Sequence, residues 1–120
     1  MNIEELRNYC LSFAETTEGF PFDEKALVFK VFNKMFLLTN IDDFNSINIK
    51  CDPEFALERR ETYPEVTPGY HMNKKHWNTV NINQSIGDET LKKWIKESYN
   101  LVVKALPKKT QQKVTPRNCG

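Results

Sequence analysis

The 120-residue chain contains only four glycines, three cysteines and two histidines. So few glycines argue against a glycine-rich loop that cradles phosphate groups. The cysteines form no Cys-x-x-Cys pair, which argues against a zinc site, and their odd number fits free thiols in a reducing compartment. No apolar run approaches the length of a membrane span, and the first residues lack the features of a signal peptide. We therefore expect a soluble, cytoplasmic protein.

The chain also lacks an excess of positive or negative charge, because 17 basic and 16 acidic side chains leave a formal net charge of +1. That balance argues against a protein that grips nucleic acid by bulk positive charge. The two ends differ, however: residues 1–25 carry six acids and two bases, and residues 104–120 carry five bases and no acid. This asymmetry indicates either an ordinary solvated surface with a basic tail or a dipolar molecule that orients on an anionic partner.

Helix and strand patterns follow one another along the chain. Residues 2–14 begin with a capping-box pattern and continue with apolar residues at helical spacing. Two strand-like runs, 26–32 and 35–41, are separated by Asn33-Lys34, and a third run over 46–51 alternates in polarity. Asp52-Pro53 begins a second helix that ends near Tyr63-Pro64. A fourth strand over 76–82 and a final helix with a long apolar stripe complete the order.

This order, α-β-β-β-α-β-α, predicts an α+β two-layer sandwich with helices packed on one face of an antiparallel sheet. We expect one domain over residues 1–110 and a flexible basic tail over 111–120. A hairpin turn at Asn33-Lys34 pairs Phe32 with Met35. It also places four apolar side chains on the outer face of the sheet, Val28, Phe32, Met35 and Leu37. Contact with another protein or a second copy of the chain is therefore one functional alternative.

The segment Pro68–Val80, PGYHMNKKHWNTV, holds both histidines, one of the two tryptophans and a lysine pair. His71 and His76 are five residues apart, and no cysteine or acid within the segment completes a ligand set, so a metal site is not expected. A catalytic site would use His76 as a base with Cys51 or Ser85 as the nucleophile. No carboxylate or nucleophile elbow supports that chemistry, so no enzyme and no cofactor is predicted.

Anion binding suits this segment better, because residues 66–87 contain no acid. Lys74 and Lys75 are expected in a turn before a strand, where exposed lysines can contact phosphates. The predicted contact residues are Asn73, Lys74, Lys75, His76 and Asn78, with Arg59 and Arg60 of the second helix and the basic tail extending the surface. In the alternative, structural interpretation, Trp77 is a packing anchor, His76 and Asn73 tie the loop to its neighbours, and the lysines are solvated.

The form His-x-Asn-Lys-x-His-Trp-x-Thr-Val, followed by a polar turn and a long final helix, resembles the MmcQ/YjbR family. The segments LRNYCLSF, KVFNKMFLL and YPEVTPGYHMNKKHWNTVNI occur in the order of that family's segments, over roughly residues 1–110. The resemblance implies a CyaY-like, that is frataxin-like, α+β fold, DNA binding through a double-wing arrangement and no established catalytic activity. The matching motif residues are His71, Asn73, Lys74, His76, Trp77, Thr79 and Val80.

The frataxin-like fold adds a further alternative, the binding of a metal ion by acids near the start of the chain. Hard cations favour carboxylate ligands. The acids concerned are Glu4, Glu5, Glu15, Glu18, Asp23 and Glu24. Because they are spread over a helix and a loop, a solvated face is their more ordinary role. Among the alternatives for a binding partner, we expect DNA first, and then another protein or a second copy of the chain.

Overall fold

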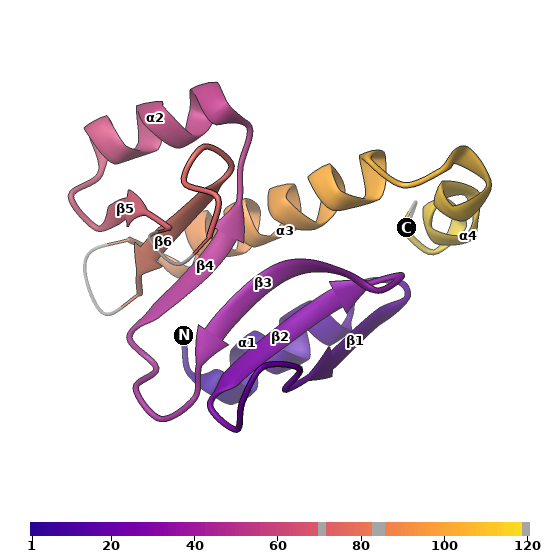
Figure 1. Cartoon of the computed structure of the whole chain (residues 1–120), viewed down its shortest axis with the longest axis horizontal. Coiled ribbons are helices and arrows are strands. Elements are labelled where there is room, and N and C mark those ends of the chain that lie inside the picture. Colours follow the sequence, from indigo (N-terminus) through magenta and orange to yellow (C-terminus); the bar gives the residue numbers. More distant parts are fainter. Residues whose placement is uncertain (70–71, 83–85, 119–120) are drawn as a thin grey trace.

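The computed structural model describes residues 1–69, 72–82 and 86–118 of the chain, with the side chains of 115–118 left out. These residues form an antiparallel sheet in the order β1-β2-β3-β4-β6-β5, together with four helices (Figure 1). The elements are α1 (Ile3–Leu11), β1 (Thr16–Gly19), β2 (Ala26–Val31), β3 (Lys34–Asn40), β4 (Ser46–Lys50), α2 (Pro53–Thr62), β5 (Val66–Pro68), β6 (Trp77–Asn81), α3 (Asp88–Lys104) and α4 (Lys108–Asn118).

Helices α1 and α3 pack against one face of the sheet, which confirms the predicted α+β two-layer class (Figure 1). The predicted capping box at Asn2 and Glu5 is present, and Leu6 of α1 is fully buried. From α3, Tyr99 is fully buried and its ring lies edge-on to that of Phe36, with 5.3 Å between centroids. The apolar stripes read from the sequence therefore form the core. Of the helices that the structure describes, none is both long and apolar enough to cross a membrane.

Ser98 of α3 joins β3 to β4 where the pairing of these strands stops. The register of the two strands runs only from Thr39–Ile47 to Leu37–Ile49. Beyond it, the fully buried Ser98 hydroxyl donates to the Phe36 carbonyl at 2.6 Å and accepts from the Lys50 N–H at 2.8 Å. One side chain thus satisfies two backbone groups that have moved out of each other's reach.

The β2–β3 hairpin turns one residue earlier than predicted. β2 ends at Val31 and β3 begins at Lys34, so Phe32 and Asn33 occupy the turn with φ angles of 44° and 67°. The predicted pairing of Phe32 with Met35 is wrong, because Val31 pairs with Lys34 instead. Two successive positive φ angles suit the twist of a two-residue hairpin turn, and asparagine tolerates them better than most residues. Phenylalanine gives no such signal, so the sequence pointed to the wrong pair.

Replacement of Asn33 by alanine is expected to lower the free energy of unfolding by about 1 kcal/mol, because alanine lacks the polar group through which asparagine hydrogen-bonds locally and so tolerates positive φ. Asn33→Gly is the matched control, since glycine adopts this conformation without strain and should leave stability unchanged or slightly raised. Urea unfolding of both variants measures the difference. Equal losses in the two variants would instead assign the effect to contacts of the asparagine side chain.

A bulge in the same hairpin changes which β3 side chains face the core. The register shifts between Phe29 and Lys30, so that Phe29 pairs with Leu37. Phe36 and Leu37 are both fully buried as a result. The predicted place of Leu37 on the outer face is therefore wrong, because a bulge inserts one residue that simple alternation cannot reveal. Val28 is also only 1% exposed, so the apolar outer surface expected for a partner is much smaller than predicted.

Two short strands at the edges of the sheet were not predicted. β1 pairs with β2, and β5 pairs with β6 through Val66–Val80, Thr67–Thr79 and Pro68–Asn78. β1 has four residues and is mostly polar, and β5 has only three, so no apolar alternation marks either strand in the sequence. Pro68 is tolerated because an edge strand needs hydrogen bonds on one side only.

Residues 108–118 form α4, where a flexible tail from residue 111 was expected. Val114 is 1% exposed and belongs to the core cluster. The Gln111 amide donates to the carbonyls of Lys104 and Leu106 at the end of α3, at 3.1 and 2.6 Å. Because this valine is a single apolar anchor in a polar segment, the sequence has no apolar periodicity there that would predict a helix. Figure 1 places α4 beyond the C-terminal end of α3, on the other side of the molecule from α2 and β5.

Candidate anion-binding site

The candidate site is the turn between β5 and β6, which the structure describes from Met72 onward. Asn73 organises it: its side-chain oxygen accepts from the Lys75 N–H at 3.0 Å, and its carbonyl accepts from the N–H groups of His76 and Trp77 at 3.1 and 2.9 Å. The side chains of Asn73, Lys74 and Lys75 are exposed, and that of His76 is half-buried. The predicted turn before a strand is confirmed, because β6 begins directly after His76.

Arg60 of α2 holds this turn in place. Its guanidinium donates to the carbonyls of Lys74 and Trp77, the latter at 3.4 Å, and its Nε donates to the Asn78 side-chain oxygen at 2.6 Å. Asn78 is 1% exposed, and its amide donates to the Ala56 carbonyl at 3.2 Å. Both side chains were predicted to contact phosphates. In the structure they are occupied in fastening the turn to α2.

Arg59, also predicted as a contact residue, is directed at α3. Its guanidinium carbon lies 4.7 Å from the centre of the Trp94 ring, a cation–π distance, and the group forms an ion pair with Glu97. Tyr63 packs edge-on against the same tryptophan, with 5.0 Å between centroids. Arg59 therefore joins the two helices and does not extend the lysine surface.

Lys50 is a neighbour of the turn that the sequence did not reveal. The β4–β6 register sets Lys50 opposite Trp77, and the N–H of Cys51 donates to the His76 carbonyl at 2.7 Å. Because Ile49 faces the core, Lys50 lies on the outer face, where it is half-buried. Its outward direction was readable from strand alternation. Its place opposite Trp77, which follows the lysine turn directly, depends on pairing between segments distant in sequence.

The other motif residues have structural places. Val80 is 1% exposed in the core, and the Thr79 hydroxyl donates to the Asn48 side chain at 2.6 Å on the outer face. Trp77 is 8% exposed, which agrees with its interpretation as a packing anchor. It leaves so little room at Gly69 that an added Cβ would approach the Trp77 Cβ to 3.0 Å, so a side chain at position 69 would require a shift. His71 lies outside the described residues.

A catalytic arrangement around Cys51 gains no support. The thiol is buried, and burial raises its pKa, so the reactive thiolate is disfavoured. The Cys10 thiol is buried as well, and burial raises its pKa still further. Ser85, the other nucleophile considered, lies outside the described residues.

Two of the acids near the start of the chain, Glu18 and Asp23, are occupied locally. Glu18 forms an ion pair with Arg7 at 2.6 Å, which lowers the pKa of the carboxyl, and Asp23 accepts the backbone N–H groups of Lys25 and Ala26. Across the described part of the chain, no three His, Cys, Asp or Glu side chains gather in a way that could hold a metal ion.

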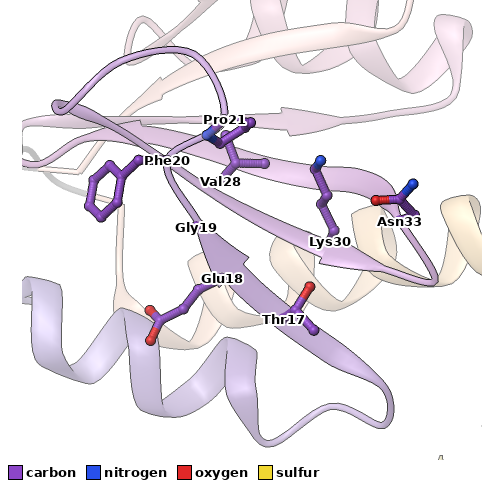
Figure 2. A pocket seen from close by; sticks show the side chains of 8 residues that line it. All are labelled: Thr17, Glu18, Gly19, Phe20, Pro21, Val28, Lys30 and Asn33. Carbon is purple, nitrogen blue, oxygen red and sulfur yellow. The ribbon is translucent and has the colours of Figure 1, made fainter.

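A separate hollow of about 340 Å³ lies on the outer face beside β1. Figure 2 shows Thr17, Lys30 and Asn33 on one side of it, while the Phe20 ring points away from them. Phe20 is 48% exposed, and Phe22, in the same loop, is 67% exposed. β1 and β5 are the opposite edges of the sheet, so this hollow is not part of the lysine turn.

Fold and site together define a small α+β domain, with an antiparallel sheet backed by helices and a lysine-bearing turn beside its β5 edge. The profile of the YjbR family matches residues 11–101, and the chain belongs to that family. The predicted resemblance is thus confirmed.

The relatives support the same assignment. The chain is 41% identical over 97 residues to the uncharacterized protein YbdF of Escherichia coli, with 80% of each chain covered. It is 29% identical over 113 residues to the uncharacterized protein YjbR of Escherichia coli, with 93% of this chain and 96% of the relative covered. The crystal structure of a Deinococcus radiodurans protein with a DUF419 domain has a TM-score of 0.88 at 36% identity, covering 95% of this chain and 88% of that one. A Pseudomonas syringae crystal structure has a TM-score of 0.71 at 28% identity, covering 84% and 98%.

Proposed function

We propose that this protein is a non-enzymatic module that binds nucleic acid through the turn of residues 73–76. The observation that supports this best is the fastening of the turn by Arg60, which fixes the backbone from which Lys74 and Lys75 project. Lys50 adds a third ammonium group on the adjoining strand. Lysine side chains and backbone N–H groups are the usual contacts to phosphate oxygens. A turn whose backbone is already fixed loses less conformational entropy when such contacts form.

DNA is the partner class that the family resemblance suggests, and a cytoplasmic location fits the free thiols of Cys10 and Cys51. With a net charge of only +1, the attraction depends on local charge, so binding is expected to weaken steeply as salt rises. The placement of α4 at the other end of α3 separates its lysines from the turn. Replacing those lysines therefore tests whether binding depends on the charge of the turn or on the overall charge of the protein.

The double variant Lys74→Glu with Lys75→Glu is expected to weaken DNA binding about tenfold at about 50 mM salt, because two phosphate contacts are lost. The slope of log Kd against log salt concentration should fall by about two, one for each lysine. Fluorescence anisotropy with a labelled oligonucleotide measures both quantities. Thermal unfolding should change little, because both side chains are exposed.

The matched control is Lys108→Glu with Lys109→Glu in α4, which changes the net charge by the same amount on exposed side chains. This variant should retain most of the affinity. Equal losses in the two variants would show that overall charge, and not the turn, governs binding. Absence of any binding by the wild-type protein at low salt would remove the proposal.

A further inference from the structure

A second hollow, of about 630 Å³, lies on the outer face of the sheet over β4, β6 and β5. Its size falls within the range of small-ligand sites, although it is open to solvent. The lining residues are Asn45, Ser46, Pro64, Glu65, Thr67, Thr79 and Asn81. It lies on the half of the sheet that also carries the lysine turn, and the proposed function leaves it without a role.

The chemistry of this hollow is unlike that of a phosphate site. Three hydroxyls, two amides and one carboxylate line it, and none of the described residues in its wall is basic or aromatic. The carboxylate of Glu65 would repel a phosphate. Hydroxyl, amide and carboxylate groups together offer both donors and acceptors, which are the groups that pair with base edges and sugar hydroxyls.

The wall of the hollow is also fixed in position. The Thr79 hydroxyl donates to Asn48 at 2.6 Å, and the Thr67 hydroxyl donates to the Thr79 carbonyl at 3.5 Å. The backbone N–H of Asn81 donates to the Glu65 carbonyl at 2.9 Å, which ties the start of β5 to the end of β6. A polar surface held in this way changes little on binding, which favours recognition over nonspecific contact.

Strand β6 connects the two features along one face. The outward-facing pairs of β4 and β6 are Lys50–Trp77, Asn48–Thr79 and Ser46–Asn81, in that order from the lysine turn to the hollow. Four strand steps separate Trp77 from Asn81, a length of about 13 Å. An extended polyanion can therefore touch the lysines at one end and the hollow at the other.

We infer that the outer face of β4, β6 and β5 binds single-stranded nucleic acid, with phosphates at the lysines and a base edge or sugar in the hollow of Ser46, Glu65, Thr67, Thr79 and Asn81. This inference rests on the proposed function and specifies its ligand. A single strand exposes base edges that a sheet face can reach, whereas a duplex keeps them within its grooves. Since none of the described residues that line the hollow is aromatic, hydrogen bonds and not base stacking supply the contact.

The test uses anisotropy of one labelled DNA oligonucleotide, as a single strand and annealed to its complement. The wild-type protein should bind the single strand more tightly. Thr67→Val with Thr79→Val removes two hydroxyls at constant charge and shape and should weaken single-strand binding about fivefold, with the salt slope and duplex binding unchanged. Thr67→Ser with Thr79→Ser keeps the hydroxyls and should retain binding. Thr17→Val, on the outer face of β1, is the control for a general effect of such replacements.

The outcomes separate the two proposals. Equal affinity for single strand and duplex, or no effect of the valine variant while the lysine variant still loses affinity, would overturn the inference and leave the proposed function standing. An effect of Thr17→Val as large as that of the paired valines would also overturn it. No binding of either oligonucleotide would remove the proposed function, and this inference with it.

Discussion

Replacing Ser98 with alanine is expected to lower the free energy of unfolding by about 3 kcal/mol, because it leaves two buried backbone groups without a partner, each at a cost of about 1 to 3 kcal/mol. The groups are the Phe36 carbonyl of β3 and the Lys50 N–H of β4. Alanine is the better helix former by about half a kcal/mol, so helix propensity acts against the expected loss. Urea unfolding at constant temperature measures the change.

Asn100→Ala is the control on the same helix, at an exposed position. It should change stability by no more than about 0.5 kcal/mol. If Ser98→Ala costs as little as this control, the two backbone groups find other partners and the serine is not what joins the strands. If the slope of the unfolding free energy against urea concentration differs from that of the wild type, two-state behaviour is lost and a second spectroscopic probe is required.

Arg60→Ala should be about as destabilising, at about 3 kcal/mol, because it removes a charged donor shared by several acceptors. The acceptors are the carbonyls of Lys74 and Trp77 and the side chain of Asn78, which is 1% exposed. The loss of Arg60 leaves the amide oxygen of Asn78 buried without its donor, which costs more than the bond itself contributed. Thermal and urea unfolding both report this loss.

A double-mutant cycle with Asn78→Ala sharpens this prediction. The combined variant should cost at least about 1 kcal/mol less than the two single losses added together, because the residues share one hydrogen bond. Arg7→Ala is the comparison, since Arg7 forms an ion pair with Glu18 on the surface and should unfold close to wild type. Additive losses for Arg60 and Asn78 would contradict the shared bond that fastens the turn.

The parts of the fold that were predicted correctly are those with local signals. The capping box at Asn2, the Asp52-Pro53 helix start and the apolar stripe of α3 each depend on residues within a few turns of helix. The β2–β3 hairpin was predicted with the wrong register, because Phe32 adopts a positive φ that its side chain disfavours and a bulge follows. Packing of the whole sheet imposes such a conformation, and a short stretch of sequence holds no information about that packing.

The site divides in the same way. The turn with its exposed Lys74 and Lys75 was predicted, since it depends on polar residues directly before a strand. The hydrogen bonds of Arg60 and Asn78 that join the turn to α2 were not predicted, because they require α2 to lie against β6. Lys50 was missed for the related reason that β4 and β6 meet only through folding. Individual basic residues are visible in a sequence, but whether each faces water or a neighbouring element is a tertiary property.

The hydroxyl of Ser98 also bears on how cooperatively the sheet unfolds. Strands β1–β3 and strands β4–β6 are each built from consecutive chain segments. Three residue pairs, this hydroxyl and the side-chain hydrogen bonds of Thr39 and Asn48 join the halves at β3 and β4. Helix α3 packs on both β3 and β4, so it couples two units of low contact order into one. The lysine turn and the polar hollow lie wholly within the second unit. Ligand binding there should slow amide hydrogen exchange first in β4, β6 and α2, and in β1 and β2 only later, through β3 and α3.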